Sequence, residues 1–275
     1  YRLPAFFEEY VTLLTPQDTG VFAQLMGNSQ LKREAVNSFE IGYSGSYLNN
    51  RLTFDADTYL AKYTSLVQSV LLQPFAVIIP PFPPIIQPAV ASVNNSVRAR
   101  AYGIELEAGY RPVSWAKFFA NYTWEHITDD VKSPIARRNS KATPANKVGL
   151  GMNFKFTEDS IPHMSFLNHF SLNVNSHYRD TFDHYDETGF TLSQSKIKRN
   201  IRLDLMISRS FFDEAAEVAF IAQNLSSRHH FEASQVEVPQ LFFVAVTFRD
   251  WPWEFLKKKE ARKKGFFQDY LSRES

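Results

Sequence analysis

The sequence predicts an all-β fold, an antiparallel transmembrane β-barrel. Apolar and polar side chains alternate with a period of two residues, short and long connections alternate along the chain, and aromatic residues make up 15% of the 275 residues. A membrane barrel alternates lipid-facing apolar residues with lumen-facing polar ones, and it carries aromatic girdles at both interfaces. Its mean hydropathy therefore stays near neutral, as the value of −0.29 does here.

The alternation predicts nine full strands and an incomplete one at the start. A helix would instead place apolar residues at i, i+3 and i+4. The strands are roughly 10 to 15 residues long, which exceeds the usual length in globular sheets and suits a tilted crossing of the bilayer. Charged residues on the opposite face are expected to line a wet or plugged lumen. The clearest apolar rows run through 39–47, 102–110, 116–124, 148–156, 170–178, 201–207 and 242–248.

Connections of two lengths separate these strands. Short ones fall at Asn49-Asn50, Pro112-Val113-Ser114, Asp213-Glu214 and, slightly longer, from Glu158 to Met164, and long ones fall at about 13–37, 65–96, 129–144, 181–196 and 227–238. Outer-membrane barrels have this asymmetry, with tight periplasmic turns and long outer loops. A soluble β-sandwich or β-solenoid is the alternative fold, but neither requires short and long connections to alternate over so many hairpins. Aromatic residues beside the short turns suggest a periplasmic girdle: Tyr47, Tyr110, Trp115, Phe156, Phe166, Phe211, Phe212 and Phe248.

Composition excludes several classes. The chain has no cysteine, which excludes disulfide scaffolds, zinc knuckles and thiol catalysis. Its net charge of +1 gives no reason to expect a nucleic-acid partner. The apolar stretch 67–93 contains six prolines, so it is not a transmembrane helix. No signal peptide and no initiator Met precede Tyr1, and we expect the chain to be part of a longer protein.

Ordered motifs resemble the C-terminal half of TonB-dependent receptors over about residues 1–250. Tyr1-Arg2-Leu3-Pro4 is similar to the family's F-R-x-P segment, and 27–34 (GNSQLKRE) resembles its N-P-x-L-K-P-E box with Ser29 and Arg33 in place of the prolines. Residues 38–43 (SFEIGY) and 100–107 (RAYGIELE) resemble two of its strands, and the second is the most specific match. Three later segments also fit, at 121–124 (NYTW), 144–147 (PANK) and 222–225 (AQNL). Each motif is weak alone, whereas their order and spacing are specific.

The resemblance implies that these are the C-terminal nine to ten strands of a barrel of about 22 strands around an N-terminal plug. It implies a bacterial outer-membrane receptor surrounded by lipid, which works with the TonB complex to import a siderophore, cobalamin, haem, a metal complex or a glycan. The plug and the TonB-contacting segment are not in this chain. A receptor-like barrel that serves as a structural or interaction subunit is the second hypothesis. The barrel unit is predicted to cover 1–250, with the last strand ending at Phe248.

Two stretches depart from the resemblance. The outer loop 71–93 is apolar and proline-rich, which predicts a polyproline-like contact surface for a protein or a lipid-like ligand, or else a segment that packs on neighbouring loops. The tail 251–275 reads as a basic, largely helical periplasmic segment that could bind a membrane surface or a partner, with a solvated tail as the alternative.

Enzymatic readings find little support. The segment 42–46 (GYSGS) misses a nucleophile elbow because Ser46 stands where Gly is required. His177, Asp180, Asp183, His184 and Asp186 gather near a strand end, but none has a diagnostic metal-ligand spacing, and His229-His230 is equally ambiguous. By the resemblance a haem receptor would carry a His between the two boxes, and 5–26 has none. We predict no enzyme, no catalytic or metal residues and no cofactor, and the ligand-binding residues stay unassigned.

Overall fold

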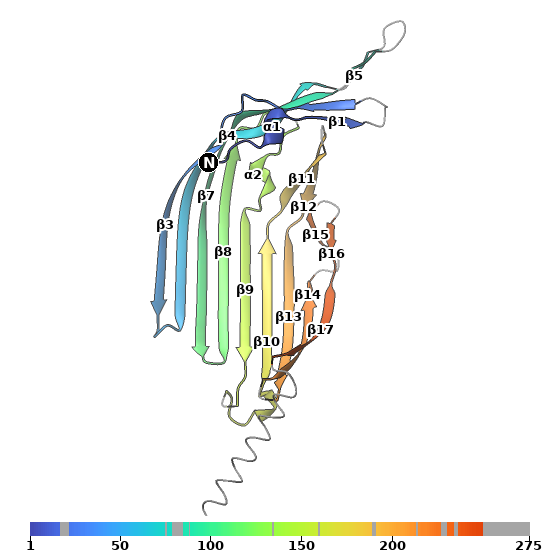
Figure 1. Cartoon of the computed structure of the whole chain (residues 1–275). Coiled ribbons are helices and arrows are strands. Elements are labelled where there is room, and N and C mark those ends of the chain that lie inside the picture. The colour runs from blue at the N-terminus through green and yellow to red at the C-terminus, as the bar shows by residue number, and fades with distance from the viewer. Residues whose placement is uncertain are drawn as a thin grey trace, which may run out of the picture.

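The computed structural model describes residues 1–16, 22–74, 76–78, 85–87, 89–133, 135–158, 160–188, 191–212, 214–226, 230–233 and 236–249. Among them no helix is long and apolar enough to cross a membrane. The predicted tail 251–275 lies outside these residues. Strands dominate, and most of them form one continuous sheet that is curved, with a convex and a concave face (Figure 1).

Nine of the eleven strands of the main sheet form an antiparallel meander, which confirms the predicted fold. Each of the nine strands pairs antiparallel with the next of the nine along the chain. The loop strands that lie between them in the sequence form separate hairpins. The strands are β3 (Ala35–Tyr47), β4 (Leu52–Gln73), β7 (Val90–Val113), β8 (Ala116–Asp129), β9 (Asn146–Lys155), β10 (Phe170–Arg179), β13 (Asn200–Phe211), β14 (Ala216–Gln223) and β17 (Leu241–Phe248). The last strand ends at Phe248, as the sequence indicates.

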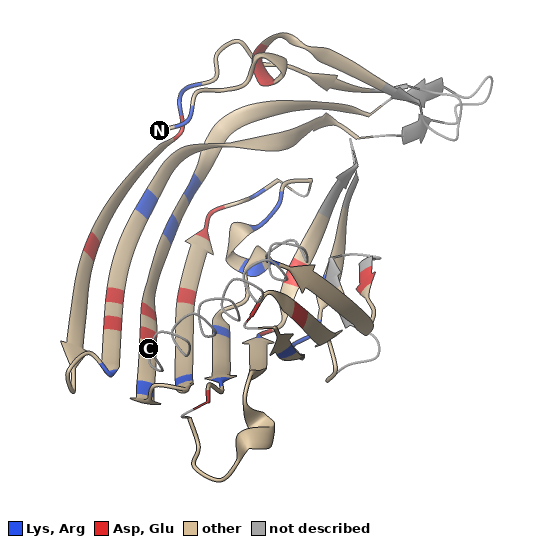
Figure 2. Cartoon of the chain, turned by 60° about the horizontal axis from the view of Figure 1, so that its bottom comes forward, with Lys and Arg blue, Asp and Glu red and all other residues tan. Residues whose placement is uncertain are grey.

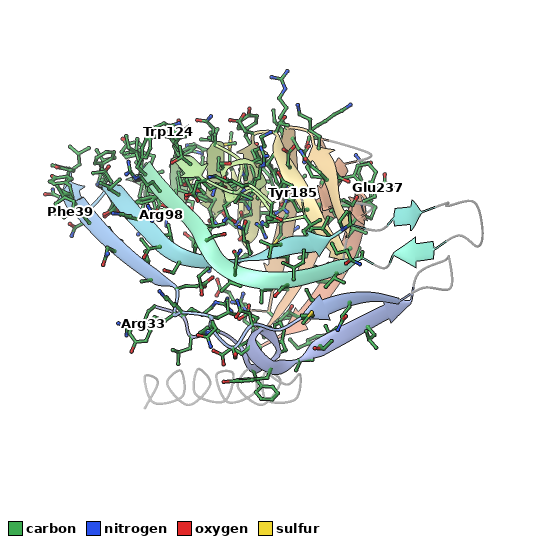
Figure 3. The ribbon with its side chains drawn as sticks, turned by 90° about the horizontal axis from the view of Figure 1, so that it is seen from above. Arg33, Phe39, Arg98, Trp124, Tyr185 and Glu237 are labelled. Atoms are coloured by element: carbon green, nitrogen blue, oxygen red, sulfur yellow. The ribbon has the colours of Figure 1, made fainter. Side chains whose placement is uncertain are left out.

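The two faces of the sheet differ as the alternation predicts. On the convex face Phe39, Ile41 and Tyr43 of β3 are 65%, 58% and 52% exposed, which is the orientation of lipid-facing side chains. Phe39 and Trp124 lie along the outer side of the curved sheet seen from above (Figure 3). The alternate residues lie on the concave face. Such exposed apolar rows are stable only against lipid, so the convex face is the membrane surface of the barrel.

The short connections are tight turns at one end of the sheet, as predicted. Leu48, Asn49 and Asn50 take positive φ values of 52°, 56° and 63° between β3 and β4, and Phe212 and Glu214 do the same before β14. The turn between β9 and β10 is longer and contains the 3-10 helix η1 (Ser165–Leu167). Because these connections are short, they fix the register in which successive strands pair.

The long connections are more regular than predicted. β4 and β7 have 22 and 24 residues, beyond the predicted 10 to 15, because they continue past the barrel as a hairpin with register shifts between Tyr63 and Gln68. Strands β5 (Ala76–Ile78) and β6 (Ile85–Gln87) pair further along this hairpin. The polyproline-like reading of loop 71–93 is therefore wrong for its described parts, where backbone pairing prevails. Its prolines at 80–84 and 88 lie outside the described residues.

The other long connections also carry small elements at the same end (Figure 1). The opening residues make only one isolated bridge, Arg2 with Glu34, in place of a strand end. These elements are α1 (Phe6–Tyr10), β1 (Thr12–Pro16), β2 (Phe22–Met26), α2 (Asn139–Ala142), β11 (Phe182–Thr188), β12 (Thr191–Ile197), β15 (His230–Ala233) and β16 (Val236–Val238).

Candidate functional site

The concave wall of β3, β4, β7 and β8 carries a strip of carboxylates. The register places Asp57 opposite Glu105 and Asp55 opposite Glu107 on neighbouring strands. Like charges that face each other across strands repel. No Lys or Arg of the described residues lies within ion-pair distance of these four groups or of Glu40 and Glu125. Figure 2 shows the strip as red bands across the four strands. We call Glu40, Asp55, Asp57, Glu105, Glu107 and Glu125 the acidic strip.

Gly103 lets one side chain cross the strip. The hydroxyl of Tyr59 on β4 donates a hydrogen bond of 2.6 Å to Oε2 of Glu125 on β8, across the whole width of β7. A Cβ at Gly103 would lie 2.8 Å from the Tyr59 hydroxyl and 2.6 Å from the Trp124 carbonyl oxygen. The glycine of the 100–107 motif is therefore needed for close approach. Its two glutamates, Glu105 and Glu107, remain exposed on the wall.

At the outer end a second cluster joins the first two motifs. Nε of Arg2 lies 2.6 Å from Oε2 of Glu34, and its Nη2 lies 3.1 Å from Oε1 of Glu8. The other oxygen of Glu34 accepts the Val67 backbone N–H at 2.7 Å. This N–H follows the irregularity where Ser65 takes a φ of 57° and β4 shifts register. We call Arg2, Glu8, Glu34 and Val67 the loop clasp.

Electrostatics strengthen the loop clasp. Burial alone would raise the pKa of Glu34, but the hydrogen bonds from Arg2 and Val67 outweigh it and hold that pKa below its usual range. The same carboxylate raises the pKa of Arg2. Glu34 is thus ionised at neutral pH.

Two amide side chains, those of Asn28 and Asn95, anchor the rest of the 27–34 box to the hairpin of β4 and β7. Asn28 accepts the Gln30 N–H at 2.9 Å and donates to the Val93 carbonyl at 3.0 Å. Asn95 accepts the Lys32 N–H and donates to the carbonyls of Lys32 and Ser65. Residues 24–26 of β2 pair in parallel with β7, where Leu25 packs on Ala91. The box therefore attaches the N-terminal arm, residues 1–34, to the hairpin formed by β4 and β7.

Two later motifs hold the outer rim of the strands. Asn146 donates to Asp180 at 2.5 Å and accepts from Tyr122 at 2.7 Å, while Tyr178 donates to the other Asp180 oxygen at 2.6 Å. The Tyr178 and Asn146 hydrogen bonds hold the pKa of Asp180 below its usual range. These residues tie the upper ends of β8, β9 and β10 together.

Asn224 has the corresponding role after β14. It is 1% exposed and has a φ of 59°. Its backbone N–H donates to Asp204 at 2.9 Å, and its side-chain amide donates to the Val238 carbonyl at 2.9 Å. Asp204 also pairs with Arg202 at 2.9 Å. The 222–225 motif therefore ends a strand and fixes the loop that leaves it.

Comparison with known families settles the relationship. The family described as TonB dependent receptor-like, beta-barrel matches residues 1–225. The chain belongs to this family. Comparison with curated proteins gives no match.

Solved TonB-dependent receptors share the fold at low identity. The pyoverdine outer membrane receptor FpvA of Pseudomonas aeruginosa PAO1, bound to pyoverdine, has a TM-score of 0.58 at 14% identity over 87% of this chain and 33% of that chain. A mutant ferric enterobactin receptor PfeA of the same species has 0.60 at 16% identity, over 86% and 35%. The siderophore receptor PirA of Acinetobacter baumannii has 0.58 at 12% identity, over 85% and 34%. The chain spans about one third of these receptors.

The candidate metal residues of this TonB-dependent receptor chain do not converge. His177 lies within β10 and His184 within β11, and no three His, Asp or Glu among the described residues could hold a metal ion. His230 begins β15, whereas His229 lies outside the described residues. The segment 42–46 lies inside β3 and is not a strand-to-helix elbow.

Sequence reasoning found the motifs but missed several of their partners. Tyr59, Asn95 and Val67 lie outside every motif, and only the strand register brings them to Glu125, Lys32 and Glu34. The apolar loop packs partly on its neighbours, since buried Ala89 and Ala91 contact Leu25 and Ile135. This agrees with the second of the two readings of loop 71–93.

Proposed function

We propose that this chain forms the C-terminal part of the barrel of an active outer-membrane transporter that takes up a scarce ligand such as a siderophore, cobalamin or glycan. Family membership supports a receptor or transporter role. The similar solved structures are named as receptors for pyoverdine and ferric enterobactin, and those ligands are properties of those proteins. The location in the bacterial outer membrane is part of the proposal.

The observation that carries the proposal is the acidic strip. Its six carboxylates share a wall whose described residues offer them no ion-pair partner, and Asp57 faces Glu105 directly. Directly opposed carboxylates destabilise the pairing of neighbouring strands, and a cationic segment in the lumen would relieve this repulsion. We propose that a plug, contributed by a part of the full-length receptor outside this chain, supplies such a segment. A plugged lumen fits energy-driven uptake by the TonB complex, in contrast to an open pore.

The barrel unit is proposed to end near residue 250. Strand β17 pairs with β14 on one side only, so its other edge is available for the first strand of the complete barrel. The basic tail 251–275 would then lie at the periplasmic side, next to the short turns.

A scaffold or interaction subunit is the second candidate. The length of the β4–β7 hairpin favours it, because this hairpin projects from the barrel and has an apolar sequence between 71 and 93. An apolar sequence in an outer loop favours a contact surface for another protein.

The test compares ligand uptake and partner capture in the full-length protein. The double variant Asp57→Asn/Glu105→Gln leaves plug cations unpaired, and we expect uptake of the cognate ligand from a panel of ferric siderophores and cobalamin to fall about tenfold or more. The control Glu158→Gln/Glu214→Gln removes two charges at the turns and should leave uptake unchanged. Uptake must also require TonB.

Unchanged growth of a deletion strain on every scarce iron chelate and on cobalamin and glycans would contradict transport. Absence of a plug-sized segment and a TonB box before Tyr1 would contradict it as well. If a protein co-purifies with the wild type and is lost on deletion of 75–88, the receptor also has a scaffold role. Uptake of ligand by the same wild-type protein would show that this role exists beside transport.

A further inference from the structure

The convex face of β3, β4, β7 and β8 changes from apolar to basic over a single step of the strand register. One row across the four strands contains Phe39, Leu60, Tyr102 and His126. The next row toward the outer loops contains Asn37, Lys62, Arg100 and Thr128. Two residues of a strand rise about 7 Å, so the boundary is sharp. It marks the height at which the apolar band of the barrel ends.

The basic row places like charges together. Lys62 and Arg100 are directly opposite each other, and Arg98 lies two residues beyond Arg100 on the same face. Directly opposed like charges destabilise a sheet by themselves. All three side chains are exposed, and within the described part of the chain no carboxylate forms an ion pair with any of them. We call Lys62, Arg98 and Arg100 the basic triad. Figure 2 shows its blue bands on β4 and β7, beyond the red bands of the same strands.

A hollow of about 380 Å³ lies at the basic triad. Its lining includes the three cations, Thr128, Asp129 and Asp130. Asp130 accepts the Arg98 backbone N–H at 2.6 Å. The alternation of β8 turns Asp129 to the other face, where it accepts the Ser140 N–H at 2.8 Å. Both carboxylates therefore have backbone partners, and the cations keep free donors for an external anion.

We propose that the basic triad binds the phosphate of an anionic lipid in the outer leaflet. Phosphate matches the donors, because guanidinium groups bind its oxygens in pairs and lysine adds a point charge. The position selects a lipid: acyl chains of the same molecule would run down Leu60, Tyr102 and Ile104, which are 53%, 39% and 41% exposed on the convex face. Free phosphate offers the same charge without this apolar contact. The inference needs only the membrane barrel and does not depend on transport.

The test titrates the full-length receptor, in neutral detergent, with lipid A as the phosphorylated probe and measures occupancy by native mass spectrometry. For Lys62→Gln/Arg98→Gln/Arg100→Gln we expect binding roughly 10- to 100-fold weaker, since each cation near a membrane surface contributes about fivefold. The charge-conserving variant Lys62→Arg/Arg98→Lys/Arg100→Lys should retain most of the affinity. If the triple variant does not assemble, Lys62→Gln and Arg100→Gln are measured singly, each with about fivefold loss.

The matched control is Lys117→Gln/Lys147→Gln/Lys155→Gln, which removes three positive charges from the concave face. It should bind the lipid like the wild type. Equal affinity of wild type and the triad variant would overturn the proposal, as would an equal loss in the control. Displacement of lipid A by inorganic phosphate at the lipid's own concentration would show a free-anion site and would also overturn it.

Discussion

The guanidinium of Arg2 and the carboxylate of Glu34 meet at 2.6 Å and join the two ends of the arm, residues 1–34, directly before β3. The arm is also held by the backbone hydrogen bonds between Arg2 and Glu34, by the short parallel pairing of β2 with β7, and by hydrogen bonds of the Asn28 and Asn95 side chains. Glu34 also caps the irregular point of β4 through the Val67 N–H. One carboxylate thus fixes both the arm and the bend of the outer hairpin.

Removing this carboxylate should loosen the arm. In Glu34→Ala the Val67 N–H loses its side-chain acceptor and Arg2 keeps only Glu8, and we expect the free energy of local opening to fall by about 1–3 kcal/mol. Amide hydrogen exchange of 1–34 and 64–70 measures this in the purified receptor. The control Glu9→Gln changes a nearby carboxylate outside the loop clasp, and it should exchange like the wild type. Equal protection in Glu34→Ala would contradict a role in closure.

The same contact predicts a pH dependence. The pKa of Glu34 is lowered in the folded protein, so its stabilisation is complete above the ordinary glutamate pKa and is lost as the pH falls through the lowered value. Exchange protection of the arm, corrected for intrinsic rates, should therefore decrease only in that acidic window. Glu34→Gln cannot titrate, so it should lack this component. A protection loss of equal size in Glu34→Gln would assign the effect to another group.

Gly103 should tolerate no side chain. In Gly103→Ala the new Cβ meets both the Tyr59 hydroxyl and the Trp124 carbonyl, and we expect a loss of about 1–3 kcal/mol in barrel stability. Heat-modified mobility on gels gives the unfolding temperature. Gly109→Ala is the matched control, because its Cβ would meet one side-chain atom, the Thr53 hydroxyl at 2.7 Å, and no backbone atom. Tyr59→Ala should not rescue Gly103→Ala fully, since the backbone clash at 2.6 Å persists; full rescue would show that Tyr59 alone requires the glycine.

The extent of sequence prediction follows from how far each interaction reaches along the chain. Period-two alternation depends on neighbours, so β3, β8 and β17 could be placed, with Phe248 at the end. The extension of β4 and β7 could not be predicted, because it depends on backbone pairing between 66–73 and 90–97. The prolines of the loop between these segments favour a polyproline-like conformation when the sequence is taken alone. The motif at 27–34 was recognisable, but its reason was not, because Asn28, Lys32 and Glu34 bind residues more than 30 positions away.

Asn224 offers the sharpest separation of backbone and side-chain effects. Its positive φ favours Asn or Gly, and its buried amide holds the Val238 carbonyl. Asn224→Gly keeps the backbone conformation and loses the amide, so we expect a loss of about 1–2 kcal/mol. Asn224→Ala adds backbone strain, and the loss should be larger by about 1 kcal/mol. Unfolding temperatures in the ranking wild type, glycine, alanine would support both roles. If Asn224→Gly and Asn224→Ala have equal unfolding temperatures, the φ of 59° costs no stability at this position. The side-chain amide alone then explains why the 222–225 motif contains asparagine.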